Sequence, residues 1–156
     1  MKARLIASVA LAATIVLGAT GCNLVSAQST TKAYDPSDGV SVSVGDLRLN
    51  NLIVLTDDGV DGNLIFTVSN RGGPHSVTLQ YGDDVTVTTI VDGNTSTVFG
   101  GENDPIALPD IDSEPGSVMP LFVQYGDETG KEVLVPVLDG TISPYDEFLP
   151  EASTAE

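Results

Sequence analysis

The stretch VSVSVGDLRLNNLIVL, residues 40–55, decides the fold of this chain. Valine and serine alternate over Val40–Val44, so the valine side chains share one face of an extended strand. The apolar pattern continues as a longer strand over Leu47–Leu55, in which Asn50-Asn51 is a candidate bulge. This stretch therefore predicts two early strands of a β-sheet domain.

The same pattern recurs along the rest of the chain, with turns rich in Gly, Asp, Asn and Pro between apolar segments. We expect further strands over residues 64–68, 77–81, 85–91, 95–99, 118–125 and 132–138. The last two predict a hairpin, and a turn at 92–94 predicts another between 85–91 and 95–99. About eight short strands, with turn signals roughly every 8–12 residues, predict an all-β fold, a β-sandwich.

A short repeat marks two of these strands. Gln80-Tyr81-Gly82-Asp83-Asp84 returns as Gln124-Tyr125-Gly126-Asp127-Glu128, each time after an alternating apolar segment. We interpret both copies as strand ends followed by tight turns, in which the tyrosine closes the core.

The N-terminal 22 residues predict export and lipid attachment. A basic head with Lys2 and Arg4 precedes a mostly apolar, uncharged run, and small residues lead to Cys22, the single cysteine of the chain. The end of this segment, Ala19-Thr20-Gly21-Cys22, resembles the lipobox of bacterial lipoproteins, in which the thiol is acylated and cleavage makes the cysteine the new N-terminus. The alternatives are an ordinary cleaved signal and a retained helix, which would be short for a membrane span.

The predicted organisation has four parts. Residues 1–21 are a lipoprotein signal peptide, and residues 22–39 are the lipidated Cys22 with a flexible tether. Residues 40–142 form the β-sandwich domain, and residues 143–156 form an acidic disordered tail. The protein is expected at the extracytoplasmic face of the cell membrane.

The mature chain is strongly acidic. It keeps four basic residues and all 22 acidic ones, which gives a formal net charge of −18. Such a surface repels nucleic acid and anionic headgroups, because phosphate binding depends on Lys and Arg. The charge serves solubility, or it attracts cations or a basic partner.

Candidate catalytic residues are few. His75, beside Ser76, is the only histidine, and no Gly-x-Ser-x-Gly motif accompanies it. We therefore expect the protein not to be an enzyme and to need no cofactor.

Candidate metal ligands are equally sparse. Soft copper sites combine His, Met and Cys, and the mature chain offers His75, Met119 and the blocked Cys22. His75 and Met119 are therefore weak metal candidates. The acidic turn at 57–63 could attract calcium but does not fit an EF-hand loop, and Asp and Gly are ordinary turn residues.

The longest irregular segment, residues 100–116, is the candidate recognition element. Its apolar Ile106, Leu108 and Ile111 lie between prolines in a segment too irregular for a strand. Long structureless loops in compact domains are often functional, so we predict that these three residues contact a partner. The alternative is that they cover one end of the sandwich.

Three segments carry a family resemblance over roughly residues 34–149: Val44–Asn51, the turn at 124–127, and residues 135–140 (VPVLDG). They resemble actinobacterial lipoproteins of the mycobacterial LpqE type. Those proteins are similar in architecture to periplasmic copper chaperones of the PCuAC type, which implies an immunoglobulin-like or cupredoxin-like sandwich. The copper family's set of two His and two Met is not met here, since only His75 and Met119 could stand in.

Together these observations favour a lipid-anchored, non-enzymatic interaction or assembly-assisting module with an envelope protein as partner. The alternative is a divergent copper-chaperone-like metal-binding protein.

The lipid anchor gives the first testable prediction. Cys22→Ala removes the thiol that would be acylated, so the variant should leave the membrane fraction and appear in the soluble fraction. Fractionation followed by immunoblotting measures this. A variant that stays with membranes as fully as the unchanged chain would contradict the lipoprotein assignment.

Overall fold

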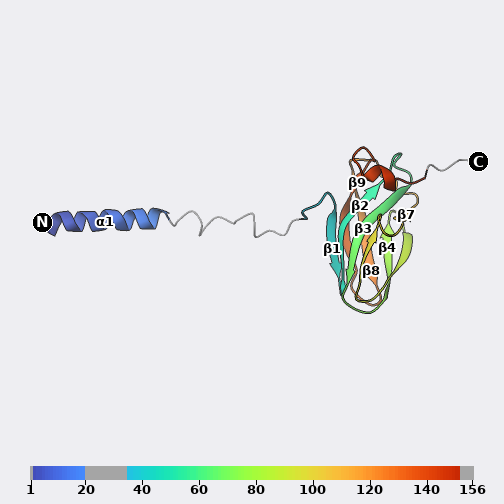
Figure 1. Cartoon of the computed structure of the whole chain (residues 1–156), viewed down its shortest axis with the longest axis horizontal. Helices are drawn as coiled ribbons and strands as arrows, with labels where there is room; N and C mark the ends of the chain where they lie inside the picture. Colours follow the sequence, from blue (N-terminus) through green and yellow to red (C-terminus); the bar gives the residue numbers. More distant parts are fainter. Residues whose placement is uncertain (1, 20–34, 152–156) are drawn as a thin grey trace, which may run out of the picture. The chain divides into compact units, whose positions relative to one another are not determined.

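A computed structural model describes residues 2–19 and 35–151 (Figure 1). The chain divides into an N-terminal unit that ends at Tyr34 and a second compact unit that begins at Asp35. Cys22 and the predicted tether up to residue 34 lie outside the described residues, as does the end of the predicted tail, 152–156.

The described part of the N-terminal unit is helix α1 (Lys2–Ala19), which coincides with the predicted signal segment. No helix among the described residues is both long and apolar enough to cross a membrane.

The second unit is all-β, as the sequence predicts, and its described residues contain nine strands. They are β1 (Val40–Val44), β2 (Leu47–Leu55), β3 (Gly62–Asn70), β4 (His75–Tyr81), β5 (Val85–Val91), β6 (Ser96–Phe99), β7 (Ile106–Leu108), β8 (Val118–Tyr125) and β9 (Lys131–Leu138). The order across the curled sheet is β5-β4-β8-β9-β2-β3-β6, with β1 paired to β2 and β7 to β3. The additional strand is β7, which lies inside the segment predicted to be irregular.

Strand β9 joins the two layers of the sandwich. Residues Lys131–Pro136 pair antiparallel with β8, whereas Val137 and Leu138 pair parallel with β2. The change of partner occurs directly after Pro136, which has no amide proton to donate. One strand thus belongs to both layers. The antiparallel pairing of β8 with β9 also confirms the predicted hairpin of the last two strands.

The predicted bulge at Asn50-Asn51 is confirmed. The pairing of β2 with β3 shifts between Asn50 and Ile53, and Asn51 has a φ of 55°. Asparagine tolerates this left-handed conformation better than most residues. Leu47 and Leu49 therefore face the core before the bulge, and Leu52 and Val54 face it afterwards.

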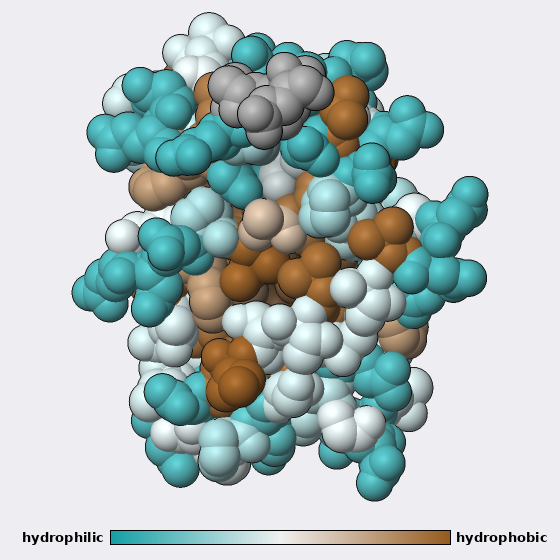
Figure 2. All heavy atoms as spheres, turned by 90° about the vertical axis from the view of Figure 1, so that its right-hand side faces the viewer, coloured by the Kyte–Doolittle hydropathy of each residue, from teal (hydrophilic) through white to brown (hydrophobic). Residues whose placement is uncertain are grey.

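The main core lies between the two layers, and every one of the nine strands contributes at least one buried side chain to it. Half-buried side chains at its margin include Val85 and Val87 on β5 and Ile106 on β7. Figure 2 shows apolar side chains in the middle of one face of the molecule, with hydrophilic ones around them.

One predicted hairpin is wrong. Strand β5 pairs with β4, and β6 pairs with β3, so the turn at 92–95 crosses between layers. Buried Asn70 holds this crossing, because its side-chain amide donates to the carbonyl oxygens of Gly73 and Asp92 at 2.7 and 2.9 Å. These tertiary contacts outweigh the local turn preference.

The predicted disordered tail from residue 143 is also wrong for its first part. Residues Tyr145–Phe148 form a 3-10 helix, η2. Tyr145, Phe148 and Leu149 pack on a second cluster made by Ile53, Leu55 and Ile65. Ile53, Leu55 and Ile65 point away from the main core. The C-terminal segment therefore covers apolar surface that would otherwise face water.

The chain entering the sandwich is bonded to it before residue 40, although the sequence predicts a tether to residue 39. The Gly39 N–H donates to Asn51 Oδ1 at 3.0 Å, and the Tyr145 hydroxyl donates to Asp38 at 2.8 Å. Gly39 is required at this point, because an added Cβ would lie 2.6 Å from the backbone of Asn51. The folded unit thus includes residues 35–39.

The C-terminal cover predicts a stability effect. Phe148→Ala removes a half-buried ring from the second cluster, so the free energy of unfolding should fall by about 1–3 kcal/mol. Ile142→Ala is the matched control, because Ile142 is 67% exposed and its truncation should cost less than about 0.5 kcal/mol. Urea denaturation measures both, and equal values would contradict a packed C-terminal segment.

Candidate functional site

The three apolar residues predicted to contact a partner are part of the domain interior. Leu108 and Ile111 are 0% and 4% exposed and belong to the main core, and Ile106 packs against that core at intermediate exposure. Strand β7 holds Ile106 and Leu108 in place by pairing with β3. The structure therefore supports the alternative interpretation, in which these side chains cover one end of the sandwich.

His75 and Met119 do not form a common site. His75 starts β4, and its ring lies 4.1 Å from the ring of Tyr125 at the end of β8. Met119 lies at the start of β8, three residues before Phe122, which pairs with Gln80 of β4. The antiparallel register thus separates the two residues by eight strand positions, roughly 25 Å.

The described residues, 2–19 and 35–151, include no cluster of three or more His, Cys, Asp or Glu side chains suited to a metal ion. In the acidic turn at 57–63, the Val60 N–H donates to Asp58 at 2.9 Å, and this bond lowers the pKa of that carboxyl. Gly59 N–H donates to the buried Thr56 hydroxyl. These bonds account for the turn as a structural element.

The repeated tyrosines lie at strand ends and close the core, as the sequence predicts, and the antiparallel pairing of β4 with β8 places them at opposite ends of the sandwich. Tyr81 is buried, and its hydroxyl donates to the carbonyl oxygen of Pro109 at 2.9 Å. Tyr125 is buried at the other end, where its hydroxyl accepts the Asp46 N–H at 2.8 Å. Each tyrosine ties a strand end to a loop from a distant part of the chain.

A cavity of about 430 Å³ opens at the Tyr81 end of the sandwich. It is formed by the β4–β5 turn, the loop after β7 and the start of β8. Its lining residues are Gly82, Asp83, Val85, Asp110, Ile111, Asp112, Ser113, Met119 and Pro120. Three carboxylates thus surround a floor to which buried Ile111 and Met119 contribute apolar surface.

The loop conformation at the cavity is set by backbone geometry. Asp110 and Asp112 have φ angles of 52° and 44°, so the chain turns twice within three residues and places Ile111 in the core between them. The Asp110 N–H donates to Asp61 at 3.2 Å, and the Ile111 N–H donates to the Val60 carbonyl at 2.7 Å. The two exposed carboxylates are therefore presented by a fixed loop.

The potential at this end is negative enough to affect a neighbouring group. Burial, with a smaller contribution from the charges of Asp110 and Asp61, raises the pKa of Tyr81 to about 12. A second cavity of about 340 Å³ lies next to this loop and includes Asp61, Pro109 and Glu151 in its lining. The loop end of the sandwich is thus concave and acidic.

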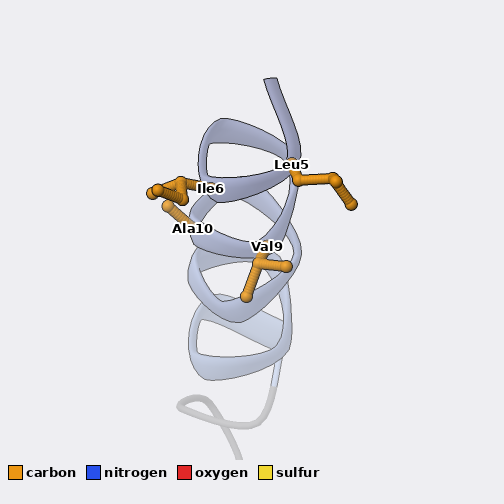
Figure 3. A pocket seen from close by; sticks show the side chains of 4 residues that line it. All are labelled: Leu5, Ile6, Val9 and Ala10. Atoms are coloured by element: carbon orange, nitrogen blue, oxygen red, sulfur yellow. The ribbon is translucent and has the colours of Figure 1, made fainter. Parts of the chain in front are cut away.

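A third hollow lies on helix α1 and is of a different kind. Leu5, Ile6, Val9 and Ala10 line it, and all four project from the same short helix (Figure 3). They are exposed in the described structure. These four side chains are apolar surface of a single helix, within the predicted signal segment.

Comparisons with known proteins place the fold. No family model matches the sequence, and no curated protein matches it. Among solved structures, the apo PCuAC domain from PmoF1 is similar with a TM-score of 0.52 and 9% identity, over 62% of this chain and 97% of that domain. The copper-bound PCuAC domain from PmoF2 gives 0.50 and 10%, over 64% and 97%. The sandwich is therefore of the PCuAC kind in its fold.

The loop that the sequence marks as a candidate recognition element borders the acidic cavity, but through other residues than the three predicted ones alone. Ile106, Leu108 and Ile111 pack in or against the core, whereas Asp110 and Asp112, on either side of Ile111, line the cavity. The signal that could have found them is the Asp-x-Asp pattern at 110–112 inside a loop framed by prolines. Its partner Asp83 is distant in sequence.

The acidic cavity predicts a change in tyrosine titration. Because the neutral phenol is favoured, the contribution of Tyr81 to stability is complete below pH 10, the unfolded value, and is lost as pH rises through about 12. Asp110→Asn removes one of the charges, so the pKa of Tyr81 should fall while burial still keeps it above 10. The ultraviolet absorbance of tyrosinate, taken as a difference from Tyr81→Phe, measures this. Asp104→Asn, in an exposed loop, should leave it unchanged, and an equal shift there would contradict a local effect.

Proposed function

We propose that this chain is a lipid-anchored, extracytoplasmic, non-enzymatic binding module whose loop-end cavity receives a cationic group of an envelope protein. The observation that carries the proposal is the combination of Asp83, Asp110 and Asp112 with the apolar floor formed by Ile111 and Met119. Carboxylates above an apolar surface suit a Lys or Arg side chain, because its alkyl stem can pack while its charged head meets the acids.

The charge of the whole domain supports this assignment. With four basic and 22 acidic residues in the mature chain, the protein attracts a basic surface over a distance of about one Debye length. The concave site then concentrates the interaction, because it gathers three carboxylates of the same charge in one hollow.

The location is supported by the N-terminal sequence. Acylation of Cys22 would hold the domain at the outer face of the membrane, and two or more acyl chains suffice for stable attachment. A tethered domain meets membrane proteins at a high effective concentration, so a moderate affinity is sufficient.

Copper delivery is the second candidate, and the similarity to the copper-bound PCuAC domain favours it. Its difficulty is geometric, since His75 and Met119 lie at opposite ends of the β4–β8 ladder. A copper site in this chain would need ligands other than this pair.

Crosslinking in intact membranes, followed by mass spectrometry, tests the proposal. Asp110→Asn with Asp112→Asn should reduce recovery of the crosslinked partner roughly fivefold, because each weakened ion pair contributes up to about 1 kcal/mol. Asparagine keeps the left-handed backbone that both positions require. Asp57→Asn with Asp104→Asn changes the net charge equally at exposed sites outside the cavity and should have little effect.

Two results would contradict the proposal. Equal losses in both double variants would assign the effect to net charge rather than to the cavity. Tight copper(I) binding by the purified protein, lost in His75→Ala, would favour the copper candidate.

A further inference from the structure

Strand β5 is the long regular edge of the sandwich. It stands at one end of the strand order, and among the described strands it pairs only with β4. The two strands form seven consecutive residue pairs, from His75–Val91 to Tyr81–Val85, with no shift of register. One side of β5 therefore presents its backbone N–H and C=O groups for a further strand.

This edge carries none of the features that commonly prevent strand addition. Its sequence, VTVTTIV, contains no charge, proline or glycine, and all seven residues are β-branched. The other edges differ, since β6 has four residues, β7 has three, and the pairing of β1 with β2 is interrupted by a shift. Short or irregular edges are poor templates for pairing, whereas β5 is a good one.

The side chains of β5 also leave apolar surface uncovered. Val85 and Val87 point toward the core but are only half-buried, because no strand lies beyond them. On the outer face, Ile90 is 74% exposed. Strand β5 lies at the right-hand edge of the sandwich in Figure 1, and Figure 2 views the molecule from that side, where apolar side chains occupy the middle.

The charges around β5 identify the kind of occupant. Asp83 and Asp84 precede the strand and Asp92 follows it, so both ends are acidic. A second copy paired antiparallel about Thr88 would set Asp84 opposite Asp92 of the other copy, and like charges in that position are destabilising. A segment with basic residues at both ends has the complementary pattern.

We infer that β5 accepts an extended segment of a partner protein as an added antiparallel strand, with an uncharged β-branched centre and basic residues at both ends. This inference rests on the proposed function and specifies how the partner reaches the cavity. Gly82, Asp83 and Val85 line the cavity at the start of β5. In the antiparallel orientation, the C-terminal basic residue of the segment lies at that end and enters the cavity.

Synthetic peptides test the inference on the purified, unlipidated Cys22→Ala protein. The probe has seven alternating Val and Thr residues with two Lys at each end, and a second peptide carries Glu in place of Lys. The Lys peptide should bind saturably, and the Glu peptide should bind at least tenfold more weakly. On binding, amides within residues 85–91 should gain protection from hydrogen exchange.

Two N-methylated Lys peptides separate strand pairing from charge attraction. One is methylated on its Val amides and the other on its Thr amides, and both keep the full charge. In a strand, the Val amides point to one edge and the Thr amides to the other. Since the valine side chains must face the core, only one edge of the peptide can pair with β5. One methylated peptide should therefore lose binding at least tenfold, and the other should keep it. Equal binding of the two methylated peptides, or loss of binding by both, would overturn the inference. This test uses the same protein throughout, so misfolding of a variant cannot explain its result.

Variants distinguish this inference from the cavity proposal. Thr88→Pro should weaken the Lys peptide at least tenfold, with thermal unfolding used to confirm that the variant folds. Asp110→Asn with Asp112→Asn should weaken it only a fewfold and preserve the difference between the methylated peptides. If that double variant bound the Lys peptide with unchanged affinity, the proposed role of the cavity would be refuted, while strand addition at β5 would stand. Concentration-dependent dimers that Thr88→Pro abolishes would show that a second copy, rather than a partner segment, occupies β5.

Discussion

Asn51 changes the side of the sheet to which the residues of β2 point, and both apolar clusters of the domain depend on that change. Before the bulge, leucines at odd positions face the main core, and after it the even positions do. Ile53 and Leu55 are consequently turned to the opposite face, where they require a second cover. The C-terminal segment with η2 supplies it. The same asparagine accepts the Gly39 N–H, so the bulge also binds the entry of the chain to strand β2.

Strand β9 determines which edges of the sandwich are open. Because β9 pairs with both β8 and β2, the two layers are joined on one side. On the other side, β5 ends one layer while β6 and β7 end the other, and no strand among residues 35–151 pairs with both. At the β5 margin of the core Val85 and Val87 are only half-buried, and the acidic cavity lies at the start of this strand. Cavity and edge are two parts of one surface, which is why a single extended segment can engage both.

Much of the fold follows from local chemistry that can be read in the sequence. Alternating valines, the bulge at Asn50-Asn51 and the repeated tyrosines at strand ends were all predictable, because period-two burial and turn preference act over a few residues. The interpretation of the 100–116 loop failed for a different reason. Whether Leu108 and Ile111 face water depends on β3, which lies more than 40 residues earlier and cannot be inferred from the loop itself.

The sequence by itself determined the all-β class and the positions of most strands, since each depends on neighbouring residues. Only the tertiary structure decided that β5 and β6 belong to different layers, that His75 and Met119 lie far apart and that residues 145–149 cover Ile53 and Leu55. It also brought Asp83 beside Asp110 and Asp112. The physical reason is the same in each case: strand pairing joins segments that are distant in the chain, and burial of apolar surface selects among pairings that local preferences leave equal.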